Sequence, residues 1–300
     1  MVSIINNNIF SKKKYYVYIN IMPFFDFLEI GTSDFDTEIE KSDNTRVGMS
    51  IEPIKYYLDK LPERDNVLKV NCAISDTNGE CEIYYVNNQN AEKYNLPWWI
   101  KGCNSMSNPH PTVCKYLIKK KLNPQKLINK YKVQKKTLIT IIHEHNISGI
   151  FYLKIDTEGH DHFILNKFLN DNNDTNLLPH NIRFESNRLT PNKMTIYNLI
   201  RRLQKLGYDL ISTSRKADTI LKLNLKKVKK NKVFTKELNN YYLDNDLKHE
   251  TQHVFSNIDD AKKYCIKING TGIVFENNTY IVCTSDYLVE KQKAVCYLYL

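Results

Sequence analysis

The sequence predicts an α/β protein built on an open, mainly parallel sheet. Residues 149–165, GIFYLKIDTEGHDHFIL, begin with apolar and polar residues in alternation, as in a strand, and continue with apolar residues at helical spacing. Residues 24–30, FFDFLEI, place apolar side chains on both faces, as in a central parallel strand covered by helices. A polar turn with a glycine follows each strand, and in open α/β sheets such turns face the ligand-binding crevice.

The composition is that of a globular domain without membrane segments. The chain has 300 residues, of which 42% are hydrophobic, enough for one α/β domain with a small appendage. The early apolar stretch, residues 15–30, is interrupted by polar residues and Pro23, so we expect neither a signal peptide nor a transmembrane helix. The seven cysteines form no CxxC pair, which favours reduced thiols, a cytoplasmic location and no zinc site.

The net charge of +10 is concentrated in two segments. Residues 115–136 contain nine lysines and no acid, and residues 215–236 contain nine basic residues and one aspartate. Such segments occur on nucleic-acid-binding surfaces, but a lysine-rich helix face or linker in solvent is the commoner explanation. Nucleic acid is therefore a partner that the sequence allows but does not favour. The sequence indicates no membrane partner and no particular oligomeric state.

The turn after the strand at residues 24–30 is acidic. Gly31 follows this strand directly, and its missing side chain would let a ligand approach the backbone. The neighbouring acids, which have no lysine or arginine among them, are Glu29, Asp34, Asp36 and Glu38. They would repel the pyrophosphate of a dinucleotide and suit a cationic ligand. S-adenosylmethionine carries a sulfonium and an ammonium group, so it is the expected cofactor, with Glu29, Gly31 and Asp34 among its contacts.

Two further strands supply candidate cofactor contacts. The second predicted strand ends in Glu52, which can accept hydrogen bonds from a ribose diol, and Pro53 stiffens the turn that follows. The third, residues 66–74, leads through Ala73 to Asp76, which can accept a hydrogen bond from an adenine amine. Helix capping by Glu52 and ordinary turn formation by Asp76 are the alternative explanations.

Catalysis is assigned to polar residues at the carboxyl ends of two strands. Asp156 should point into the crevice and is the first candidate for the base that accepts a proton, with Glu158 as the second. Glu158 is also close enough to the following helix to act mainly as its cap. Lys154 is expected to lie against an acid, and Glu185, which ends a strand over residues 181–185, is the next candidate for the base.

A metal site is an alternative explanation for the same segment. The possible ligands, which recur at every second residue, are Asp156, Glu158, His160 and His162. A helix that begins after Gly159 would separate these side chains, so we expect no metal.

Three regions have weaker patterns. Residues 94–107 contain both tryptophans and have the composition of a substrate or cofactor loop, although the tryptophans can equally pack beneath it. Residues 115–136 are predicted to be helical in part, and residues 234–246 to be a linker or a peripheral helix. Residues 258–300 are predicted to form a small α+β appendage with a hairpin turn at residues 277–278.

The order of several segments resembles the FkbM family of S-adenosylmethionine-dependent methyltransferases over about residues 24–212. These segments are LEIGTSDFDT, GMSIEP, NCAISDTNGECEIY, KKTLITIIHEHNISGIFYLKIDTEGHDHFIL and IRFESN, and KIDTEG followed by Asp161 is the most specific match. The chain departs from the family's GxNxG pattern after the first strand, where it reads GTSDF.

The resemblance implies a class I, Rossmann-like sheet of seven strands and methyl transfer to a hydroxyl of a sugar, a glycan or another small metabolite. The chain would then divide into an N-terminal arm (residues 1–23), a methyltransferase domain (24–225), a basic and polar linker (226–257) and a C-terminal module (258–300). The alternative function is RNA methylation, or nucleic-acid binding with a cofactor pocket, and it rests on the two lysine-rich segments alone.

Overall fold

The computed structural model describes residues 23–106, 108–186, 193–214, 218–228, 234–235, 237–243 and 253–300. Almost all of the predicted N-terminal arm and nine of the 22 residues of the basic segment 215–236 lie outside the described residues. In the described parts of the chain, no helix combines the length and the apolar character needed to cross a membrane.

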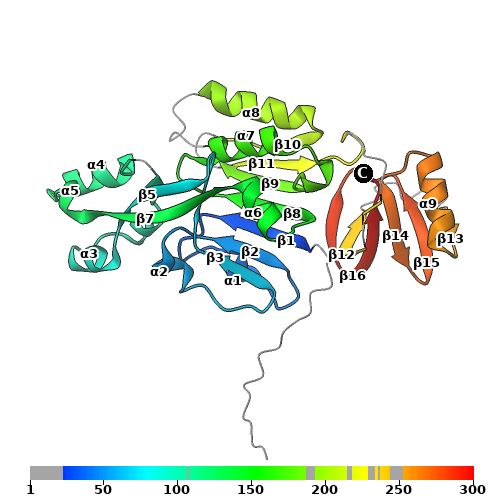
Figure 1. The fold of residues 1–300 in the computed structure, drawn as a ribbon, viewed down its shortest axis with the longest axis horizontal. Helices are drawn as coiled ribbons and strands as arrows, with labels where there is room; N and C mark the ends of the chain where they lie inside the picture. Colours follow the sequence, from blue (N-terminus) through cyan, green and yellow to red (C-terminus); the bar gives the residue numbers. More distant parts are fainter. Residues whose placement is uncertain are drawn as a thin grey trace, which may run out of the picture.

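A mixed seven-stranded sheet forms the centre of the protein, in the order β10-β11-β9-β8-β1-β2-β3 (Figure 1). Its strands are β1 (Phe24–Ile30), β2 (Gly48–Ile51), β3 (Val67–Val70), β8 (Gly149–Ile155), β9 (Asn181–Glu185), β10 (Tyr208–Ser212) and β11 (Asp218–Leu223). The strands from β3 to β9 in this order are parallel to their neighbours, whereas β11 is antiparallel to both β9 and β10. The predicted α/β class is confirmed, and the ends of β1 and β8 lie side by side.

Helices cover both faces of this sheet (Figure 1). They are α1 (Glu38–Lys41), α2 (Lys55–Leu58), α6 (Leu138–Glu144), α7 (Asp161–Asp171) and α8 (Lys193–Lys205), with a 3-10 turn, η2 (Thr175–Leu177). α6, α7 and α8 pack on the face that carries Leu28 and Leu153, and α1 and α2 pack on the face that carries Phe27. Apolar side chains on both faces of β1 therefore reflect a strand that is covered on both sides, as its sequence predicts.

The segment predicted as one strand over residues 66–74 is divided between two sheets. β3 ends at Val70, and the Asn71 side chain then donates hydrogen bonds to the carbonyls of Glu52 and Pro53, 2.9 and 2.8 Å away, where the chain leaves the central sheet. β4 (Ala73–Ser75) instead pairs with β7 (Ile128–Thr137) in a four-stranded sheet that also contains β5 (Gly79–Val86) and β6 (Ser105–Met106). The backbone pairing of each half with a different sheet separates β3 from β4, and a local sequence pattern does not indicate this pairing.

The four-stranded sheet carries the short helices α3 (Asn88–Lys93), η1 (Trp98–Lys101), α4 (Pro111–Lys119) and α5 (Pro124–Leu127), and together they form an arm beside the central sheet (Figure 1). Partial helix in residues 115–136 is confirmed by α4 and α5, but residues 128–137 form a strand. Lys130 and Lys132 of this strand make ion pairs with Glu82 and Glu80 of β5. The alternating lysines therefore belong to a strand. Its antiparallel partner, β5, lies about fifty residues earlier in the chain and stabilises it.

The C-terminal residues form an antiparallel sheet in the order β12-β16-β14-β15-β13, covered by α9 (Ile258–Lys267). Its strands are β12 (Leu238–Leu243), β13 (Val254–Phe255), β14 (Gly272–Glu276), β15 (Thr279–Cys283) and β16 (Leu288–Leu298). Asn277 and Asn278, with φ of 50° and 60°, form the predicted hairpin turn. The interpretation of residues 234–246 as a linker or helix is wrong, because 238–243 is a strand. An irregularity at Asn240 (φ 65°) breaks the alternation that would have revealed it.

The C-terminal sheet packs against the central sheet through Tyr241 of β12. The Tyr241 ring lies 5.4 Å from that of Phe24 and 4.8 Å from that of Phe151, and its hydroxyl donates to the carboxylate of Asp26. Leu238 and further buried residues of this sheet belong to the same apolar cluster as β1 and β8. The two sheets therefore share one core.

Candidate active site

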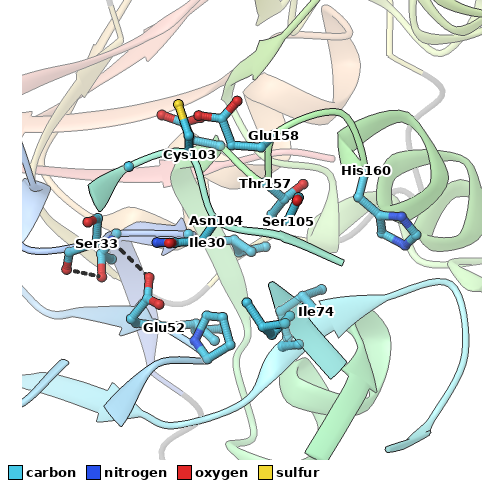
Figure 2. Close-up of a pocket in the computed structure, with 18 of the residues that line it drawn as sticks. Ile30, Ser33, Glu52, Ile74, Cys103, Asn104, Ser105, Thr157, Glu158 and His160 are labelled. Atoms are coloured by element: carbon cyan, nitrogen blue, oxygen red, sulfur yellow. Dashed lines mark hydrogen bonds between the residues drawn. The ribbon is translucent and has the colours of Figure 1, made fainter. Parts of the chain in front are cut away.

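A cavity of about 280 Å³ lies at the carboxyl ends of β1, β2 and β8 (Figure 2). Its lining comes from the turns after these three strands, from residues 72–74, and from residues 98–106 of the arm. The strand ends meet here because parallel neighbours end at the same edge of a sheet. Of the predicted site residues, those that line the cavity are Gly31, Glu52, Pro53, Ala73, Lys154, Asp156 and Glu158.

Gly31 is required by the fold itself, which is a reason for glycine beyond the one expected from the sequence. Its φ is +79°, and a Cβ at this position would lie 2.0 Å from the backbone carbonyl oxygen of Asp156. The close approach that needs a glycine is therefore between two turns of the protein, whether or not a ligand is present.

Glu29 and Lys154 form a buried ion pair beside the cavity. They are register partners on β1 and β8, and Lys154 Nζ lies 2.8 Å from Glu29 Oε1 and 3.0 Å from the carbonyl of Asp36. Burial alone would lower the pKa of Lys154, but the Glu29 carboxylate raises it above its ordinary value. Glu29 has no exposed surface, so it supports Lys154 and does not contact a ligand in the cavity. The expectation that Lys154 lies against an acid is confirmed.

Lysines neutralise much of the acidic turn after β1, and those that pair with Asp34 come from distant segments of the chain. Asp34 lies 3.0 Å from Lys60 Nζ and 3.9 Å from Lys101 Nζ, and Asp34 does not line the cavity. Asp36 lies 2.9 Å from Lys41 Nζ. The charge argument built on this turn is therefore wrong for Asp34, whereas Asp36 lines the cavity and is balanced in part by Lys41.

Glu52 is the acid of this region that has no ion-pair partner among the described residues. It is 2% exposed, and its carboxylate accepts hydrogen bonds from the backbone N–H groups of Ser33 (2.8 Å, Figure 2) and Ile54 (2.9 Å). Burial raises the pKa of Glu52 to about 7, although these hydrogen bonds oppose the shift. The carboxylate can still accept a hydrogen bond from a ligand hydroxyl, because a carboxylate accepts up to about four hydrogen bonds.

The end of the third predicted strand contributes apolar lining and a histidine contact. Ala73 and Ile74 line the cavity, whereas Asp76 lies outside it and accepts a hydrogen bond from Ser75 Oγ (3.0 Å). The same hydroxyl lies 3.0 Å from His160 Nε2, and His160 does line the cavity. The adenine contact predicted for Asp76 does not follow from this placement.

Asp156 faces the cavity from the end of β8. Its side chain is exposed, but the exposed surface opens onto the cavity, and protein surrounds it on the other sides. Burial among these groups, and then the Glu158 charge, raises the pKa of Asp156 to about 7, while Lys154 opposes the shift. A carboxyl group with a pKa near neutrality suits proton transfer at neutral pH.

The role proposed for Glu158 as a helix cap is wrong, because the N-cap residue of α7 is His160 and no side chain makes a capping hydrogen bond there. Asp161 is 1% exposed, and its carboxylate accepts hydrogen bonds from the N–H of Thr157 (3.0 Å) and the N–H of Glu185 (2.7 Å). Glu158 instead adopts φ of 55° and turns its carboxylate to His110, whose Nε2 lies 3.1 Å from Glu158 Oε2. Glu185 is placed beside Asp161 but does not line the cavity.

The predicted loop at residues 94–107 contributes one wall of the cavity, and its tryptophans differ in role. Trp99 packs edge-to-face on Tyr116 of α4 (5.4 Å), whereas Trp98 is 69% exposed and meets Phe35 edge-to-face at the cavity (5.4 Å). Cys103, from the same loop, was not singled out from the sequence.

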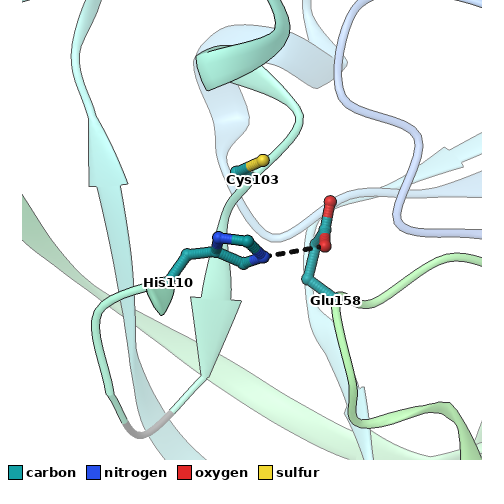
Figure 3. A group of neighbouring side chains, drawn as sticks. All are labelled: Cys103, His110 and Glu158. Carbon is teal, nitrogen blue, oxygen red and sulfur yellow. Dashed lines mark hydrogen bonds and ion pairs between the residues drawn. The ribbon is translucent and has the colours of Figure 1, made fainter. Parts of the chain in front are cut away.

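His110 was also missed, and it follows the loop just before α4. Cys103, His110 and Glu158 place one possible metal-ligand atom each within 4.8 Å of one another (Figure 3). The metal site considered from the sequence is different: His160 and His162 point elsewhere, since α7 begins at Asp161. Only the KIDTEG pattern could have drawn attention to Glu158, and nothing local predicts its histidine partner.

Comparison with known families identifies residues 27–210 as a Methyltransferase FkbM domain. The match covers the central sheet up to β10, the arm and the whole cavity lining. The chain belongs to the FkbM methyltransferase family. No curated protein and no solved structure matches the chain.

The cavity of this FkbM methyltransferase is negatively charged. Glu52, Asp156 and Glu158 line it without a lysine or arginine partner among the described residues. Lys154 is the lysine of the lining, and it is tied to Glu29. Burial lowers the pKa of His160, so this residue adds little positive charge. The net charge of the lining favours a cationic ligand.

Proposed function

We propose that this protein transfers a methyl group from S-adenosylmethionine to a hydroxyl of a sugar, a glycan or another small metabolite. The observation that carries the proposal is the cavity at the strand ends. Three carboxylates that have no lysine or arginine partner among the described residues line it, and the lysine of its lining is already paired. S-adenosylmethionine fits this charge because its sulfonium and ammonium groups are positive and it carries no phosphate. The seven-strand order, with β11 antiparallel, supports assignment to the class I methyltransferase fold.

The residues after β1 and β2 are suited to hold the cofactor. Glu52 can accept hydrogen bonds from a ribose diol with the lone pairs that Ser33 and Ile54 leave free. Pro53 and the apolar Ala73 border the same space, as predicted from the sequence. When bound, the cofactor supplies a methyl group activated by the positive sulfur.

Asp156 is suited to accept the proton of the acceptor hydroxyl. Its exposed surface faces the cavity, and its raised pKa lets it be ionised yet basic near neutral pH. Orientation of the hydroxyl supplies most of the rate, and proton removal adds roughly 10²–10⁴-fold. Glu158 and Glu185 lie near enough to influence Asp156 through their charge.

Titration calorimetry with S-adenosylmethionine tests the cofactor assignment. We expect binding in the wild type and about tenfold weaker binding in Glu52→Gln, because the amide loses the charged acceptor. Glu144→Gln is the matched control, since Glu144 is a surface acid that pairs with Lys136 away from the cavity. Equal affinity in all three proteins would remove Glu52 from the site, and absence of binding to the wild type would refute the cofactor.

A screen of hydroxylated metabolites and glycans, with mass spectrometry of the products, tests the acceptor class. We expect at least one compound to gain a methyl group in a reaction that needs S-adenosylmethionine. Methylation of RNA and of no small molecule would favour the second candidate function below.

The second candidate is RNA methylation, favoured by unpaired lysines on the arm. Lys115, Lys119, Lys120, Lys121 and Lys126 of the α4–α5 region make no ion pair within the described residues, unlike the paired lysines of β7. Contacts with phosphates would make affinity fall steeply with salt. Filter binding of RNA at two salt concentrations tests this candidate, with Lys119→Gln/Lys120→Gln as the variant and Lys130→Gln as the control.

A further inference from the structure

His110 and Glu158 form a pair in the wall of the cavity (Figure 3). His110 is 5% exposed, and its Nε2 lies 3.1 Å from Glu158 Oε2 although the two residues are 48 positions apart in the chain. Glu158 also lines the cavity next to Asp156. The pair therefore connects a buried side chain of the arm to the turn after β8, which carries Asp156.

A second hydrogen bond fixes the protonation of the histidine ring. The backbone N–H of Thr112 donates to His110 Nδ1 (3.2 Å), where the histidine caps the start of α4. Nδ1 must therefore carry a lone pair, so the ring hydrogen of neutral His110 is on Nε2. That hydrogen points at the carboxylate, and His110 donates to Glu158.

The backbone and the neighbouring thiol hold Glu158 in the same place. Its φ of 55° is a conformation that side-chain-bearing residues rarely adopt, and Gly159 follows with φ of 98°. Burial and the Glu158 carboxylate raise the pKa of the Cys103 thiol to about 12, so the thiol is neutral at pH 7. The neutral thiol adds no charge beside Glu158, and the His110 N–H is its hydrogen-bond donor.

The charge on Glu158 acts on Asp156 within a larger set of ionisable groups. The groups that influence Asp156 are Lys154 on its own strand, Arg183 and Glu185 on β9, Asp218 on β11, Asp161 on α7 and Glu158. Glu158 is the strongest charged influence among them, and its sign raises the affinity of Asp156 for a proton.

We propose that His110 is a positioning residue that holds the Glu158 carboxylate beside Asp156, the residue that accepts the proton of the acceptor hydroxyl. This inference rests on the proposed function, since it assigns the reaction's base to Asp156. The histidine reaches the reaction through Glu158 and contacts no reacting atom.

The same three side chains could otherwise serve as zinc ligands, because zinc accepts cysteine, histidine and carboxylate. Zinc would need the lone pair of His110 on Nε2 and therefore the hydrogen on Nδ1. That hydrogen would face the N–H of Thr112, and the capping hydrogen bond would be lost. The hydrogen bonds of the structure thus favour the proton-donating histidine over the metal ligand.

Nuclear magnetic resonance without cofactor or acceptor tests the proposal independently of methyl transfer. We expect the nitrogen spectrum of His110 to show the hydrogen on Nε2. In proteins with ¹³C-labelled aspartate carboxyls, we expect the titration midpoint of Asp156 to fall by about one pH unit in His110→Leu, because a nearby negative charge is lost or displaced. His110→Gln, which keeps a donor at the position of Nε2, should restore the wild-type midpoint.

Glu158→Gln keeps the test decisive if His110→Leu does not fold, because it removes the charge and leaves the α4 cap intact. It should also lower the Asp156 midpoint by about one unit, and the acidic limb of the kcat/KM profile should move to lower pH in parallel. An unchanged Asp156 midpoint in Glu158→Gln, or a hydrogen on Nδ1 of His110, would overturn the proposal. Tight zinc binding by the wild type that Cys103→Ser abolishes would also overturn it. Failure of the proposed function would instead appear as absence of S-adenosylmethionine binding with these titrations unaffected.

Discussion

At the scale of single residues, the acids of this protein differ mainly in what surrounds them. Asp34 and Asp36 look equivalent to Glu52 in the sequence, but lysines pair with the first two while Glu52 keeps backbone partners and faces the cavity. Asp156 faces the same cavity with a raised pKa. The negative charge that a ligand meets in the cavity therefore depends on which acids have no lysine partner.

Asp156→Asn should lower the turnover of methyl transfer by at least about two orders of magnitude while cofactor binding persists. The amide preserves the shape of the side chain and loses its basicity. Single-turnover methyl transfer on the acceptor found by screening measures the effect, with thermal melting to check folding. Asp171→Asn at the end of α7, which removes only a surface pair with Lys167, is the control. Full activity of Asp156→Asn would move the base to another residue.

Cofactor affinity should depend on pH through Glu52. With a pKa of about 7 in the free protein, Glu52 is protonated below neutrality, and a cationic ligand favours its ionised form. Binding then requires loss of a proton, so affinity should be constant above about pH 8 and weaken on acidification, up to about tenfold per pH unit for each proton released. Calorimetry across pH 5.5–8.5 measures this slope. Glu52→Gln should make the slope shallower, and an identical slope would contradict the assignment.

At the scale of elements, the site depends on how closely the turns after β1 and β8 approach each other. A Cβ on Gly31 would collide with the carbonyl of Asp156, so the turn that carries Asp156 can lie this close only because residue 31 is a glycine. The arm contributes the facing wall through residues 98–106, and the contact of His110 with Glu158 brings α4 and the β8 turn together. Two elements distant in sequence thereby complete one site.

Gly31→Ala should destabilise the protein more than Gly79→Ala. Both glycines have positive φ, of +79° and +135°, and such strain costs roughly 1–3 kcal/mol for alanine. The nearest atom to a Cβ at Gly79 is 4.0 Å away, whereas at Gly31 backbone lies 2.0 Å away. Gly79→Ala therefore measures strain alone, and Gly31→Ala adds a collision. Chemical denaturation gives both values, and equal losses of stability would show that the turns can move apart.

At the scale of the whole molecule, the central and C-terminal sheets behave as one folding unit. Their apolar residues form a continuous cluster, and Tyr241 joins β12 to β1 and β8 through two ring contacts and a hydroxyl bond to Asp26. An ion pair between Arg46 and Glu290 (2.7 Å) adds a contact at the same interface. Unfolding one sheet would expose the core of the other.

Calorimetry should therefore show a single cooperative unfolding transition for the protein. Tyr241→Ala should lower the free energy of unfolding by about 3–5 kcal/mol, the cost of removing a buried aromatic side chain. Tyr197→Ala, at a 49% exposed position of α8, should change it little. Two separate transitions in the wild type would contradict the shared core.

The sequence by itself determined the strands β1 and β8, the helix α7 and the acids at the strand ends, because periodicity and turn chemistry are local properties. It also contained the KIDTEG segment, whose resemblance to FkbM methyltransferases the family match confirms. Tertiary structure decided the division of β3 from β4, the strand β12 and the lysine partners of Asp34, since each depends on segments far along the chain. It also decided that Glu158 meets His110 and that the Asp161 carboxylate accepts hydrogen bonds from the N–H groups of Thr157 and Glu185. Hydrogen bonds and ion pairs form between groups a few ångströms apart in space. The order of strands in the sheet determines which groups come that close, and a local sequence pattern does not contain this order.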